Sequence, residues 1–76
     1  MASYQFTVTG IDLPMTSSEQ MPDHETARRE AILFLSELLR DLAVTKRDGS
    51  EIEVQVQGPE GEFVYSARAR LGIDRP

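Results

Sequence analysis

Apolar residues recur with helical spacing over residues 23–44. At about 100° per residue, one side of a helix there carries Ala27, Ala31, Phe34, Leu35, Leu38 and Leu42. Charged residues spread over the opposite side. The pattern predicts an amphipathic helix with a wide apolar stripe, and the face of a β-sheet is the natural partner for such a stripe.

Three segments alternate apolar and polar residues with period two, and they predict strands at residues 4–9, 51–57 and 62–71. Gly58-Pro59-Glu60-Gly61 separates the last two and is typical of a turn. With Pro59 and Glu60 at the tip, apolar residues face apolar residues throughout the hairpin. The expected pairs are Gln57 with Glu62, Val56 with Phe63, Val54 with Tyr65, Ile52 with Ala67, and Glu51 with Arg68. This register points Phe63 inward and leaves Val64 on the outer face.

Residues 10–22 show no clear period and predict a loop. Thr16-Ser17-Ser18 is typical of a turn. A short extra edge strand within residues 11–15 is an alternative, which Pro14 weakens. Asp23, after Pro22, is placed to accept hydrogen bonds from the first-turn amides of the helix.

These elements predict one α+β domain over residues 1–76, in the order β-α-β-β, with a tail at residues 72–76. The helix packs on a three-stranded, largely antiparallel sheet. Two strand orders remain open. Placing the last strand centrally makes the sheet antiparallel, whereas placing strand 51–57 beside strand 4–9 makes it mixed. We favour the antiparallel order.

The chain resembles a family of short, mostly alphaproteobacterial proteins of unknown function. The resemblance rests on the aromatic first strand beginning at Tyr4 and Phe6, on Met21-Pro22-Asp23 leading into residues 27–31, and on the closing hairpin. Members usually carry an acidic, glycine-containing turn before a Leu-Pro-Asp-like helix start. This chain has Thr16-Ser17-Ser18 there, which puts an additional hairpin in question. The resemblance implies a fold and no reaction, cofactor or site.

Composition narrows the classes of function. The 76 residues contain no cysteine, so disulfides and thiolate metal sites are excluded. Thirteen acidic residues against eight basic ones give a net charge of −5, which disfavours direct binding to nucleic acid or anionic membranes. We see neither a signal peptide nor an apolar run long enough to span a membrane, and we expect a cytoplasmic protein.

His24, the only histidine, is the one candidate for a general base or metal ligand. No nucleophile or second histidine is implied near it, so we expect an exposed residue at the helix start. No calcium-binding or phosphate-binding motif is present, and Pro22-Asp23 would set a negative charge where a phosphate must lie. We therefore expect no enzyme activity, cofactor or metal.

The remaining candidates belong to an interface with another protein. Leu33 lies away from the core stripe, and Ile32 lies on its flank. Arg68 and Arg70 share the outer sheet face with Lys46, Arg47 and Arg75, although Glu51 and Glu53 offset their charge. The candidate interface residues are Leu33, Ile32, Arg29, Arg40, Val64, Arg68 and Arg70.

Two functions follow from these surfaces. The first is a non-enzymatic protein–protein interaction module that homodimerises. The alternative is an acidic, antitoxin-like regulatory partner of a basic or nucleic-acid-binding protein.

Overall fold

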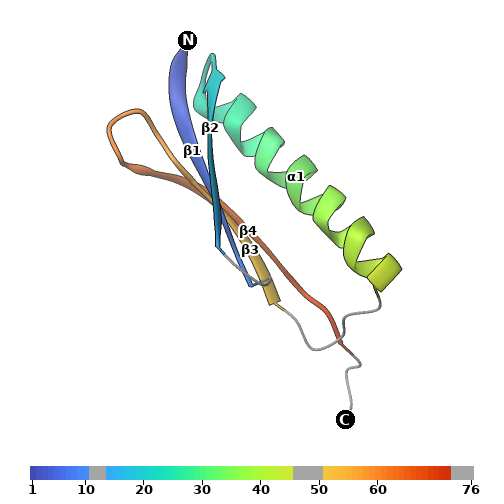
Figure 1. The fold of residues 1–76 in the computed structure, drawn as a ribbon. Helices are drawn as coiled ribbons and strands as arrows, with labels where there is room; N and C mark the ends of the chain where they lie inside the picture. The colour runs from blue at the N-terminus through green and yellow to red at the C-terminus, as the bar shows by residue number, and fades with distance from the viewer. Residues whose placement is uncertain (11–13, 46–50, 73–76) are drawn as a thin grey trace.

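The structure, a computed structural model, describes residues 1–10, 14–45 and 51–72. Its strands are β1 (Ala2–Thr9), β2 (Met15–Met21), β3 (Glu51–Gln57) and β4 (Phe63–Arg70). They form one antiparallel sheet in the order β2-β1-β3-β4. Helix α1 (His24–Thr45) runs along one face of this sheet (Figure 1). The α+β class, with a helix on an antiparallel sheet, is confirmed.

β2 is the main departure from the predicted elements. It pairs with β1 from Ala2 opposite Met21 to Val8 opposite Met15, so the turn expected at residues 16–18 is wrong. An extra edge strand does exist, but it begins where the predicted one ends. Every β2 residue before Met21 is exposed, so neither face imposes the alternation by which strands are recognised. Residues 11–13 lie outside the described part of the chain.

The extra strand also decides the strand order. β2 reverses the chain direction before α1, so that β3 enters beside β1 and antiparallel to it. β4 then occupies the far edge. β3 lies beside β1, as in the second predicted order, while the sheet is antiparallel, as in the favoured one. Each order was wrong in one respect, because both assumed that α1 follows β1 directly.

The core lies between α1 and the inner sheet face. Its helix side includes Ala27 and Ala31, which are fully buried and let the helix backbone approach the sheet. Its sheet side includes Ile52, Val54 and Val56, which are also fully buried. The complete set of buried apolar residues is Tyr4, Phe6, Val8, Ala27, Ala31, Leu35, Leu42, Ile52, Val54 and Val56.

The β3–β4 hairpin has a longer loop than predicted and a different register. Gly58 N–H donates to the Glu62 carbonyl at 2.8 Å, closing residues 58–62 as the loop. Val54 consequently faces Ala67, two positions from the predicted Tyr65. A bulge between Val56 and Gln57 then separates the pairs Val56–Tyr65 and Gln57–Phe63.

This bulge exchanges the faces of two side chains. Phe63 is 62% exposed, whereas Val64 is half-buried and packs against the core. Both predicted orientations are therefore wrong. Strict period-two counting fails here because the bulge inserts a residue into β4.

The start of α1 agrees with the predicted cap. Asp23 Oδ1 accepts a hydrogen bond from Thr26 N–H at 2.8 Å, and the first helical residue is His24. Residues 46–50 and the part of the predicted tail beyond Gly72 lie outside the described residues.

Candidate functional site

The inner face of the sheet extends beyond the helix at its β2 edge. The pairing with β1 places Met15, Ser17, Glu19 and Met21 on the same face as the core residues Phe6 and Val8. The first three of these β2 side chains are nevertheless exposed, and Met21 is half-buried. One helix cannot cover four strands, so a strip of inner sheet face stays open along α1.

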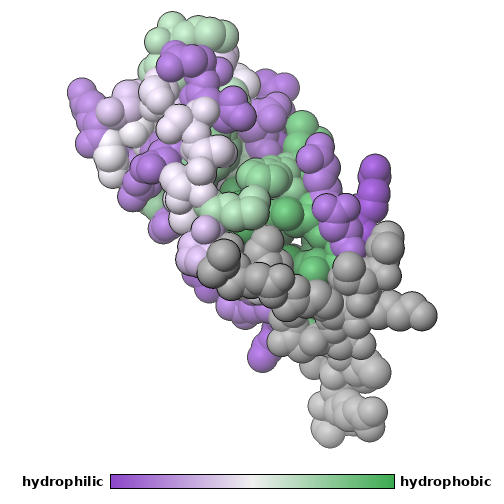
Figure 2. All heavy atoms as spheres, viewed as in Figure 1, coloured by the Kyte–Doolittle hydropathy of each residue, from purple (hydrophilic) through white to green (hydrophobic). Residues whose placement is uncertain are grey.

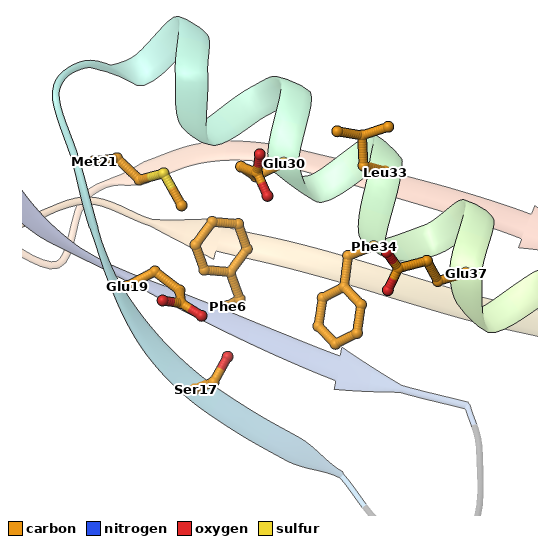
Figure 3. Close-up of a pocket in the computed structure, with 8 residues that line it drawn as sticks. All are labelled: Phe6, Ser17, Glu19, Met21, Glu30, Leu33, Phe34 and Glu37. Atoms are coloured by element: carbon orange, nitrogen blue, oxygen red, sulfur yellow. The ribbon is translucent and has the colours of Figure 1, made fainter.

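A pocket of about 350 Å³ occupies this strip, and we call it the α1–β2 groove. Its lining comes from the sheet and from one side of the helix. The lining residues are Phe6, Ser17, Glu19, Met21, Glu30, Leu33, Phe34 and Glu37. Figure 3 shows Phe6 and Phe34 lying between β2 and the helix, with Met21 at the end nearer the start of α1.

The helix side of the groove follows from sequence spacing. Glu30, Leu33, Phe34 and Glu37 stand three, four and seven residues apart, so they share one side of α1. Phe34 is half-buried against the core, while Leu33 is 56% exposed. The groove therefore continues the core outward into a partly solvated apolar surface.

The rim of the groove is acidic. Glu19 comes from β2, and Glu30 and Glu37 come from α1. None of these three carboxylates forms an ion pair with another described residue. Figure 2 shows an apolar strip bordered by hydrophilic side chains along the helix. An apolar floor with unpaired negative charges around it suits a ligand that carries apolar and positive groups.

His24 lies in a second polar cluster, at the start of α1. The Tyr4 hydroxyl and His24 Nδ1 are hydrogen-bonded at 2.7 Å, and the two rings meet edge to face at 88°. The other ring nitrogen, Nε2, is 3.7 Å from Glu62 Oε2. The hydrogen bond with Tyr4 and the proximity to Glu62 thus connect β1, α1 and the β3–β4 loop at His24.

The environment of Tyr4 keeps its phenol protonated. Burial raises the pKa of Tyr4, and the negative charges of Asp23 and Glu62 raise it further. The protonated hydroxyl therefore keeps its hydrogen bond with His24. This arrangement positions the start of the helix on the sheet.

A third polar contact lies on the opposite flank of α1. Arg28 Nη2 donates to Glu25 Oε1 at 2.7 Å, and its guanidinium carbon lies 5.8 Å from the ring centroid of Tyr65. The contact with Glu25 lies within α1, and the contact with the Tyr65 ring joins the helix to β4. The flank facing β4 is therefore covered, unlike the flank facing β2.

The structure places the interface residues predicted from the sequence in different parts of the molecule. Leu33 lines the α1–β2 groove, and Ile32, 37% exposed, does not. Arg29 and Arg40 are exposed on α1, and Val64 packs against the core.

On the outer sheet face, each arginine of β4 lies opposite a glutamate of β3. Arg68 Nε donates to Glu53 Oε2 at 3.1 Å, and Arg70 lies opposite Glu51. The glutamates of β3 thus offset the charge of these arginines, as the sequence predicted. Lys46, Arg47 and Arg75 lie outside the described residues.

Sequence reasoning missed most of the groove. The spacing of Glu30, Leu33 and Glu37 along one side of the helix was available as a signal. Ser17, Glu19 and Met21 gave none, because their strand was not predicted. Only the pairing of β2 with β1 brings these residues opposite Phe34.

Neither a metal cluster nor a membrane-spanning helix is present in the part of the chain that the structure describes. There, no group of three or more His, Cys, Asp or Glu residues is placed to hold a metal ion. Within the same residues, no helix is long and apolar enough to cross a bilayer. The cytoplasmic location stays a prediction.

Comparison with known proteins places the chain in a family. A family model described as a domain of unknown function, DUF6894, matches residues 4–70. No curated protein matches the chain, and no solved structure does so either. The matched region runs from β1 to the end of β4 and includes every residue of the α1–β2 groove. The chain therefore belongs to the DUF6894 family, whose function is unknown.

Proposed function

We propose that this chain is a non-enzymatic protein–protein interaction module and that the α1–β2 groove is its binding surface. One observation carries the proposal. The sheet is one strand wider than the helix covers, so apolar side chains that continue the core line an open pocket. Exposed apolar surface framed by polar residues is typical of interaction sites.

The chemistry of the groove supports a binding role over a catalytic one. Its polar lining consists of Ser17 and three glutamates, without a histidine or lysine to activate the serine. His24 is held by Tyr4 and Glu62 in a separate cluster. The proposed module therefore recognises a partner and performs no reaction.

Two occupants follow from the sequence hypotheses, a second copy and a basic partner protein. A second copy would bring its own Glu19, Glu30 and Glu37 toward the same acidic rim, which is repulsive. A basic partner would pair with these carboxylates. The charge of the groove thus favours the hypothesis that this chain is the acidic regulatory partner of a basic protein, rather than a homodimer.

Light scattering separates the two occupants. We expect the wild-type chain to scatter as an 8.5 kDa monomer. A wild-type dimer that Leu33→Glu converts into a folded monomer would instead identify a second copy as the occupant, since the substitution adds negative charge to a self-contact.

A comparison of two neighbouring substitutions tests the location of the surface. Leu33→Arg puts a positive charge on the groove wall, whereas Ile32→Arg makes the same change one residue away and outside the groove. We expect proteins retained from native lysate by the wild-type chain to be retained by Ile32→Arg and lost with Leu33→Arg. Equal retention by both variants would place the surface elsewhere.

A further inference from the structure

The two edges of the sheet differ in their protection against pairing with another strand. At the β4 edge, a bulge disturbs the ladder, and Arg68 and Arg70 add charge. β2 pairs with β1 over seven consecutive residues without a bulge, contains no proline, and carries one charged residue, Glu19. Native proteins usually protect the edges of their sheets with bulges, prolines and charged residues. β2 has few of these features, so it is the edge available for pairing with another strand.

β2 is also the strand that forms the floor of the groove. A strand added to its free edge would alternate its side chains across the sheet, as β2 itself does. Every second side chain of the added strand would then lie on the inner face, beside Ser17, Glu19 and Met21 and facing the open flank of α1. The strand edge and the groove thus form one continuous surface.

The charges of this surface define the incoming strand. Apolar side chains on its inner face would extend the apolar lining made by Phe6, Met21 and Phe34. Positive side chains on the same face would meet the unpaired carboxylates of Glu19, Glu30 and Glu37. Backbone hydrogen bonds to β2 would supply affinity, and the alternating side chains would supply specificity.

We propose, building on the function above, that β2 accepts an extended basic segment of a partner protein as a fifth antiparallel or parallel strand. The inner face of that segment carries apolar residues flanked by Lys or Arg. The partner is a protein with a positively charged extended segment, and the acidic rim disfavours a second copy of this chain.

A synthetic peptide provides the probe. The sequence Thr-Lys-Thr-Leu-Thr-Leu-Thr-Lys-Thr, capped at both ends and labelled with fluorescein, places both lysines and both leucines on one face of a strand. Fluorescence anisotropy measures its binding to the folded wild-type chain. A control peptide of the same composition divides the lysines and leucines between the two faces, and we expect it to bind more weakly.

Paired substitutions in the protein separate groove recognition from general charge attraction. Glu30→Gln with Glu37→Gln removes two charges from the rim, and we expect binding about fivefold weaker. Glu51→Gln with Glu60→Gln removes two charges from the outer face and the β3–β4 loop, and we expect little change. Equal weakening by both pairs would overturn the proposal.

Backbone methylation of the peptide tests strand addition itself. A strand hydrogen-bonds to its neighbour through alternate amides only. Of two peptides N-methylated at opposite sets of alternate positions, we expect one to lose binding and the other to keep it. Equal binding of the two, no binding of the unmodified peptide, or a wild-type dimer held together through β2 would each refute the proposal. Loss of lysate partners with Leu33→Arg would support the proposed function even if no peptide binds, so the two can fail separately.

Discussion

Gly10, which follows β1, has a backbone conformation that residues with a Cβ atom rarely adopt. Its φ is 98°, and a Cβ atom there would lie 1.8 Å from the backbone oxygen of Glu51. Gly61 also has a positive φ, 81°, but it has open space around the Cβ position. Substitutions at the two glycines can therefore distinguish a steric clash of the Cβ atom from the conformational cost of a positive φ.

Alanine at these two glycines should have unequal effects. We expect Gly61→Ala to lower the free energy of unfolding by about 1–2 kcal/mol, the cost of the left-handed region for a residue with a Cβ. Gly10→Ala should cost more, because backbone atoms of β3 must also move. Urea unfolding of both variants measures the difference, and equal losses would show that the close approach to Glu51 is relieved cheaply.

Asp23 makes the stability of the helix start depend on pH. Hydrogen bonds from Thr26, from its side chain and then its backbone, lower the pKa of Asp23 below its ordinary value of 3.8. The pKa of Glu25 is lowered too, by its hydrogen bond and ion pair with Arg28. A carboxyl group with a depressed native pKa stabilises the fold above its unfolded pKa and loses this contribution as pH falls.

Acid should therefore destabilise the protein through these two groups. We expect the melting temperature to fall below about pH 4, and to fall less in Asp23→Asn, because asparagine keeps a capping oxygen without titrating. Asp23→Ala, which also removes the cap, should melt lower already at pH 7. Thermal unfolding followed by circular dichroism at pH 3 to 7 measures all three proteins. An Asp23→Asn profile that parallels the wild type would assign the acid transition to other groups.

At the scale of elements, β2 differs from β1 and β3 in the interactions that stabilise it. β1 and β3 bury one face under α1, whereas the side chains of β2 before Met21 are exposed. Among the described strands, β2 pairs with β1 alone. Its stability thus comes mainly from backbone pairing. A strand with few buried contacts opens at a lower free energy than the core does.

Hydrogen exchange should resolve this difference. We expect the hydrogen-bonded amides of β2 to exchange through local opening, well before those of β3, which exchange only on global unfolding. Native-state exchange measured by NMR at low urea concentrations tests the order. Protection of β2 equal to that of β3 would show that the groove side chains hold this edge as firmly as the core does.

The elements also show which parts of the fold can be predicted from sequence patterns. α1 and β3 were predicted within one residue at each end, because each has a face buried in the core that fixes the periodicity. β2 lacks such a face and was missed. Away from the turn, the predicted inward and outward faces of the β3–β4 hairpin were correct. Its register was wrong by two residues, because the closed loop of residues 58–62 is longer than the predicted tip.

The whole molecule depends on a small core. Ile52 is fully buried between α1 and the sheet. We expect Ile52→Val to cost about 1 kcal/mol of unfolding free energy and Ile52→Ala about 2–5 kcal/mol. The second value is comparable to the total stability of a domain of this size, so part of the Ile52→Ala protein should be unfolded at 37 °C.

An exposed site supplies the control for the core. Leu33→Ala removes an apolar side chain from the groove wall, where it is already solvated, and should change the unfolding free energy by less than about 0.5 kcal/mol. Urea denaturation compares the three variants. A loss at Leu33 as large as that at Ile52 would mean that the groove belongs to the folding core and would argue against a free binding surface.

The sequence by itself determined the α+β class, the helix with its cap, and the strands that bury one face. These features are local, since a period of 3.6 or two residues and a capping aspartate act within a few residues of the chain. Only the tertiary structure decided the strand order, the bulge that turns Phe63 outward, and the groove. Each of these depends on β2 or on the loop of residues 58–62, where backbone hydrogen bonds between distant segments set the arrangement and side-chain periodicity carries no signal.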